Sequence, residues 1–62
     1  MERVEQFESL LESFKDNYEK FMDKGNNTAG TRARKALQEM RNLAKETRDD
    51  ISKTRKDREV VA

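Results

Sequence analysis

Residues 24–36 read KGNNTAGTRARKA and divide the chain into two segments that differ in charge. Both glycines of the 62-residue sequence, Gly25 and Gly30, lie in this stretch, and the chain contains no proline. On either side of the stretch, apolar residues recur at helical spacing. Since glycine and asparagine favour the ends and beginnings of helices, the stretch predicts the turn of a helical hairpin over about residues 24–28.

Before the turn, apolar side chains alternate at spacings of three and four residues. This seam consists of Val4, Phe7, Leu11, Phe14, Tyr18 and Phe21. Such spacing places the side chains on one face of a helix, as in a coiled coil. We therefore expect a first helix over about residues 3–23, ended by Gly25 in the left-handed conformation.

After the turn, a second seam has the same alternation but smaller side chains. It consists of Ala33, Leu37, Met40, Ala44, Thr47, Ile51 and Thr54. Asn26, Asn27 or Thr28 can serve as N-cap, because each offers a side-chain oxygen to the first backbone N–H groups. We expect this helix over about residues 28–57, with a frayed C-terminal end because the last residues are nearly all charged.

The two seams predict an all-α fold, an antiparallel two-helix hairpin of coiled-coil type forming a single domain. We expect Phe21 to face Leu37 and Phe7 to face Ile51. Gly30 would allow close approach by the first helix, another subunit or a phosphate. Because so short a chain buries a small core, we expect self-association into a dimer or four-helix bundle through Leu10, Met22 and Leu43. One long helix that pairs between chains remains an open alternative.

The composition argues against an enzyme. Cysteine and histidine are absent, which removes disulfides and thiolate or imidazole metal sites. A two-helix hairpin also has little room for a pocket that could tune a catalytic carboxylate. We expect no cofactor, no metal and no small-molecule substrate. The lack of a long apolar run predicts neither signal peptide nor membrane span, and hence a cytoplasmic protein without a membrane partner.

Charge is distributed unevenly. Residues 1–24 carry four Lys/Arg against seven Asp/Glu, and residues 25–62 carry ten against six. Four arginines in the second segment recur every seven residues, and we call Arg34, Arg41, Arg48 and Arg55 the arginine ladder. The ladder spans about 32 Å of helix. Such a row suits the phosphate backbone of nucleic acid, because arginine binds phosphate bidentately and displaces condensed counterions.

Lys45 extends this basic surface, and Arg32 and Lys35 thicken it near the turn. The predicted DNA-binding residues are therefore Arg32, Arg34, Lys35, Arg41, Lys45, Arg48 and Arg55. The alternative is that these charges form only a solvated or salt-bridged flank of the hairpin, with Glu8 near Arg48. The chain would then be a coiled-coil assembly or adaptor module with no nucleic-acid role.

The turn also carries a family resemblance. KGN at residues 24–26 and AGTRARKA at 29–36, followed by a helix rich in Leu, Glu, Lys and Arg, resemble the bacterial linker-histone-like nucleoid proteins of the chlamydial type, which also occur in Bacteroidetes. The resemblance covers roughly residues 4–56. It implies histone-like, sequence-independent DNA binding and compaction in the bacterial nucleoid, with Arg32, Arg34 and Lys35 matching the basic motif.

Overall fold

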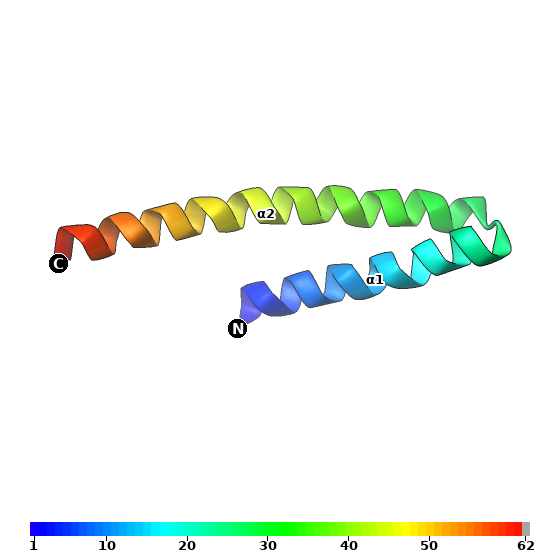
Figure 1. The fold of residues 1–62 in the computed structure, drawn as a ribbon, viewed down its shortest axis with the longest axis horizontal. Helices are drawn as coiled ribbons and strands as arrows, with labels where there is room; N and C mark the ends of the chain where they lie inside the picture. The colour runs from blue at the N-terminus through cyan, green and yellow to red at the C-terminus, as the bar shows by residue number, and fades with distance from the viewer. Residues whose placement is uncertain (62) are drawn as a thin grey trace.

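A computed structural model of the chain shows two helices folded back on each other (Figure 1). It describes residues 1–61, with side chains through Arg58. Helix α1 spans Glu2–Lys24 and helix α2 spans Asn27–Val61. The molecule is elongated, measuring 54 × 17 × 12 Å. The predicted all-α antiparallel hairpin is confirmed. The sequence predicts fraying from about residue 57, whereas α2 continues as a helix to Val61; the side chains of residues 59–62 lie outside the described part.

The turn is only two residues long. Gly25 has φ 65° and ψ 26°, the left-handed conformation predicted for it. Its N–H donates a hydrogen bond of 3.1 Å to the Phe21 carbonyl and so closes the last turn of α1. The next residue, Asn26, uses its side-chain Oδ1 to accept a 3.2 Å hydrogen bond from the Ala29 N–H. Of the three N-cap candidates, Asn26 therefore caps α2.

Small residues on α2 form the most buried part of the hairpin. Ala29, Ala33 and Ala36 are buried, together with the larger Leu43. At Gly30 an added Cβ would lie 3.0 Å from Cδ1 of Phe21, so the aromatic ring of α1 occupies the space that the missing side chain leaves. The close approach expected at Gly30 is thus made by the first helix.

The pairing of the two helices differs from the expectation. Phe21 faces Gly30 rather than Leu37, which shifts the register by seven residues, or about two helical turns. Arg3 near the other end of α1 reaches Glu46 and Asp50. The expected pairing was wrong because it assumed a longer turn than the two residues that the chain uses.

The face that α1 turns toward α2 also differs from the predicted seam. Phe7, Leu10, Phe14 and Asn17 are half-buried, whereas other seam residues are exposed. The exposed seam residues are Val4, Leu11, Tyr18 and Phe21. The amide of Asn17 tolerates this position because it donates a 2.8 Å hydrogen bond to the Ser13 carbonyl. Because α1 is rotated about its own axis relative to the predicted seam, Leu10 is half-buried between the helices and Leu43 is buried. These two residues are therefore not exposed for the self-association expected of them.

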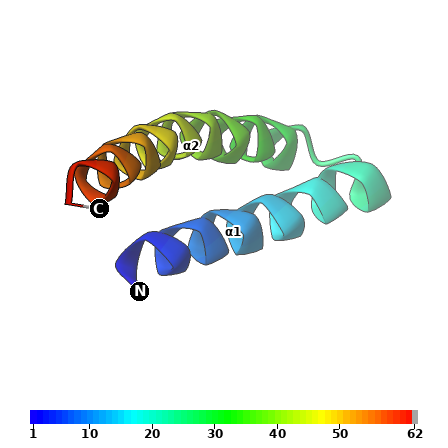
Figure 2. The same cartoon turned by 60° about the vertical axis from the view of Figure 1, so that its left-hand side comes forward.

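Helix α2 extends well beyond the start of α1, as both views show (Figures 1 and 2). Since Arg3 pairs with Asp50, the part of α2 that follows has no helix beside it. Ile51, expected in the core, is 54% exposed for this reason. The short turn shifts the register of the two helices, and the last third of α2 therefore projects as a single helix.

The geometry of the turn predicts the effect of replacing Gly25. Gly25→Ala places a Cβ in the left-handed conformation, which costs roughly 1–2 kcal/mol. We expect the free energy of unfolding, measured by urea titration with circular dichroism, to fall by about that amount. Ser52→Ala, at an exposed helical site, serves as the control. An unchanged midpoint for Gly25→Ala would contradict the tight turn.

Candidate nucleic-acid interface

The arginine ladder lies on one side of α2. All four guanidinium side chains are exposed, and the seven-residue spacing turns each by only about 20° relative to the last. At the turn end, Arg34 borders a shallow apolar groove between the helices, beside Leu37 of α2 and Tyr18 and Met22 of α1. The ladder thus runs along the edge of that face of the hairpin.

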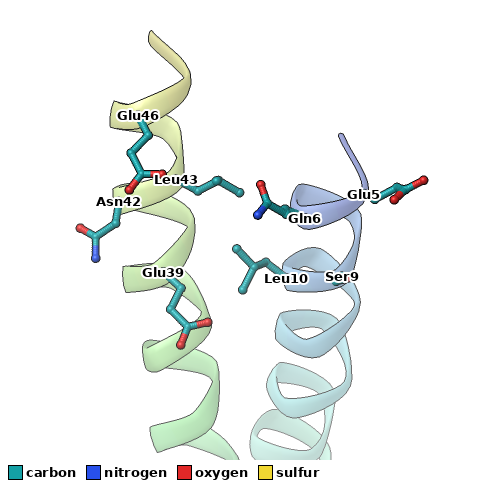
Figure 3. A pocket seen from close by; sticks show the side chains of 8 residues that line it. All are labelled: Glu5, Gln6, Ser9, Leu10, Glu39, Asn42, Leu43 and Glu46. Carbon is teal, nitrogen blue, oxygen red and sulfur yellow. The ribbon is translucent and has the colours of Figure 1, made fainter. Parts of the chain in front are cut away.

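Carboxylates occupy the other side of α2. Glu39 and Glu46 precede Arg41 and Arg48 by two residues each, an offset of about 200° around the helix. Figure 3 shows both glutamates on α2 beside the point where Leu10 and Leu43 reach toward each other. Glu39 and Glu46 thus lie across α2 from Arg41 and Arg48, whereas Asp49 follows Arg48 directly and stands one helical turn after Lys45.

The ladder arginines find no carboxylate partner within the described side chains. Through Arg58, the ion pairs within 4.0 Å are those of Arg3 with Glu46 and Asp50. The alternative that Glu8 neutralises Arg48 is not realised, because the two-residue turn shifts Glu8 away from that position. Among the side chains that the structure describes, the four ladder guanidiniums are therefore exposed and unpaired.

Arg3 links the start of α1 to the middle part of α2. Its Nη1 lies 3.3 Å from Oε2 of Glu46, and its Nη2 donates to Oδ2 of Asp50. The hydrogen bond to Asp50 raises the pKa of Arg3 above its ordinary value, and the charges of both carboxylates act in the same direction. The sequence reasoning missed this residue, although Arg3, Leu10 and Asn17 follow the same seven-residue spacing.

The other predicted site residues take different positions. Lys45 follows Arg41 by four residues and so lies on the ladder side of α2, exposed. Arg32 lines a polar groove with Asp16 and Lys20 of α1, away from the ladder. Lys35 is exposed on the outer surface of α2, beside Gln38. The structure brings five of the seven predicted residues together on one side: Arg34, Arg41, Lys45, Arg48 and Arg55.

Other kinds of site find no support in the described residues. They contain no group of three or more His, Cys, Asp or Glu side chains arranged to hold a metal ion. Neither helix, over its described length, is long and apolar enough to span a membrane. The exposed basic side of α2 is accordingly the candidate site.

Comparison with known protein families matches residues 1–57 to the family described as histone H1-like protein Hc1. The match covers nearly the whole chain. The chain belongs to this family. This match confirms the resemblance seen at the turn. Members of the histone H1-like Hc1 family are structural DNA-binding proteins of the nucleoid rather than enzymes. No curated protein and no solved structure matches the chain significantly.

The position of Arg3 predicts a salt-dependent contribution to stability. Arg3→Gln removes both interhelical ion pairs, so we expect a lower thermal midpoint at low ionic strength. The difference from the wild-type protein should shrink in concentrated salt, because salt screens exposed charges. Circular dichroism melts at two salt concentrations measure both effects. Arg55→Gln, which removes the same charge from the projecting part of α2, should leave the midpoint unchanged at either concentration.

Proposed function

We propose that this member of the histone H1-like Hc1 family binds DNA through the phosphate backbone, using the basic side of α2. The arginine ladder and Lys45 supply the main contacts, and Arg32 and Lys35 add positive charge near the turn. Binding does not depend on base sequence, because phosphate contacts fix orientation and carry no sequence information. As a homo-oligomer in the bacterial cytoplasm, the protein would contribute to compaction of the nucleoid.

The observation that carries this proposal is the absence of carboxylate partners for the ladder among the described side chains. An exposed arginine already paired with a carboxylate must give up that contact before it binds phosphate. The ladder arginines have no such contact with any described side chain, and Glu39 and Glu46 lie on the other side of α2. A polyanion can therefore bind the basic side without first breaking an ion pair of the ladder arginines.

The dimensions of the ladder also suit a duplex. Its four arginines span about 32 Å, close to one turn of B-DNA at about 34–36 Å. Helix α2 presents these side chains in a row, so several can reach phosphates at once. Each neutralised phosphate releases counterions, which makes the affinity steeply dependent on salt.

A second function is favoured by a different observation, the exposed apolar side chains of α1. These would suit an assembly or adaptor module with no nucleic-acid role. Membership in a family of DNA-binding proteins favours the first function. The two are distinguished by DNA binding at low salt, which the assembly module does not predict.

Salt dependence provides the first test. With five phosphate contacts from the ladder and Lys45, the logarithm of the binding constant should fall against the logarithm of salt concentration with a slope of about −4.5. Fluorescence anisotropy with labelled duplex DNA measures the slope, and two unrelated sequences should bind equally. A binding constant that is independent of salt would overturn the proposed contacts.

The location of the contacts can be tested by paired substitutions. Arg41→Gln with Arg48→Gln should weaken binding and lower the magnitude of the salt slope by about 2, since two phosphate contacts are lost. Lys20→Gln with Lys53→Gln removes the same charge from positions away from the ladder and is the matched control. If both double variants weakened binding equally, net charge rather than the basic side of α2 would govern affinity.

A further inference from the structure

Helix α1 carries an apolar strip that the hairpin does not cover. Val4, Leu11 and Tyr18 are spaced seven residues apart and are 49%, 58% and 47% exposed. We call these three residues the α1 strip. They lie beside the half-buried Phe7 and Phe14, so the apolar surface of α1 is wider than the part that α2 covers. The strip therefore remains available for a second helix.

We propose that the α1 strip binds the same strip of a second copy of the chain, with the two α1 helices antiparallel and a two-fold axis at Leu11. This inference deepens the self-association proposed above by naming its surface and symmetry. It does not depend on DNA binding. The partner is argued from the arrangement of apolar and charged residues along α1.

The strip is self-complementary in the way that a two-fold contact requires, since residue i must meet j and j must meet i. Val4 and Tyr18 lie seven residues on either side of Leu11, so each meets the other across the axis. Glu8 and Lys15 lie on one flank of the strip, three residues before and four after Leu11. An antiparallel partner therefore places Glu8 beside Lys15 twice.

The parallel orientation gains no such ion pairs. In a parallel contact the two-fold axis runs along the helices and exchanges the flanks of the strip, so Glu8 and Lys15 of one copy lie on the side away from Glu8 and Lys15 of the other. Charge therefore selects the antiparallel arrangement even though either orientation would bury apolar residues. This complementarity identifies the occupant as another α1 helix.

The exposed apolar residues of α2 do not form an equivalent surface. Leu37 and Ile51 are 14 residues apart, and Arg41 and Arg48 stand between them on the same face. A partner seated there would desolvate guanidiniums that DNA binding requires. The α1 strip itself contains no ladder arginine, and it adjoins the ladder only at the turn end, where Tyr18 and Arg34 line the same shallow groove.

The contact is small for a protein–protein interface. From Val4 to Tyr18 the strip is about 21 Å long. One helical face of that length buries less than the roughly 800 Å² per partner of a standard interface. We therefore expect a dimer that dissociates on dilution, which light scattering and sedimentation velocity can follow without DNA.

Disulfide crosslinking tests the position of the axis, because the natural sequence contains no cysteine. Leu11→Cys should form a disulfide-linked dimer under mild oxidation, since residues on the axis face each other. Leu37→Cys and Ile51→Cys are equally exposed controls and should remain mostly monomeric. Faster crosslinking at either control position would place the axis elsewhere and overturn the proposal, as would a wild-type chain that stays monomeric at all concentrations.

Charge reversal tests the orientation. Glu8→Lys and Lys15→Glu should each weaken the dimer roughly threefold to tenfold, because each reversal creates two like-charge contacts. The double variant restores opposite charges and should recover the wild-type dissociation constant. Failure of the double variant to recover, with helicity intact by circular dichroism, would reject the antiparallel contact. DNA is absent from these measurements, so their outcome is independent of the proposed nucleic-acid function.

Discussion

The two-residue connection at Gly25 and Asn26 is the constraint on which the rest of the hairpin depends. Because a left-handed glycine is followed directly by a capping asparagine, the connection between the helices has only two residues and a fixed backbone conformation. Phe21 must then pack on Gly30, and the remaining pairs follow from that contact. Because side chains on facing helices interdigitate, a register fixed at the turn is carried to the far end, where Arg3 meets Asp50.

The same register determines the electrostatics of α2. In the longer pairing expected from the sequence, Glu8 would have lain near Arg48 and neutralised part of the ladder. The tight turn moves Glu8 away and leaves the described ladder side chains without a carboxylate partner. It also lets α2 project beyond α1, with Arg55 on the projecting part. A local backbone conformation thus controls how much positive charge the protein presents.

The two proposed surfaces lie on different helices and adjoin at the turn end, where Tyr18 and Arg34 border one groove. The basic side belongs to α2, and the α1 strip lies on the other helix. A small hairpin with four buried apolar side chains gains little from its own core, and burial of the strip against a second copy would add to its stability. The proposal for the first surface is supported by membership in the histone H1-like Hc1 family, and the proposal for the second by the exposed heptad spacing on α1.

The sequence by itself determined the all-α hairpin, the left-handed Gly25, the N-cap at residues 26–28 and the family. These features depend on local backbone preferences and short spacings, which neighbouring residues specify. The tertiary structure decided which side of α1 faces α2, the pairing of Phe21 with Gly30, and the separation of Arg32 from the ladder. Val4, Leu11 and Tyr18 share their spacing with Arg3, Leu10 and Asn17, and polarity wrongly favoured the first set. Because α1 is apolar over a wide arc, either of these two faces could pack against α2. The length of the turn and the packing of Phe21 on Gly30 select the face with Arg3, Leu10 and Asn17.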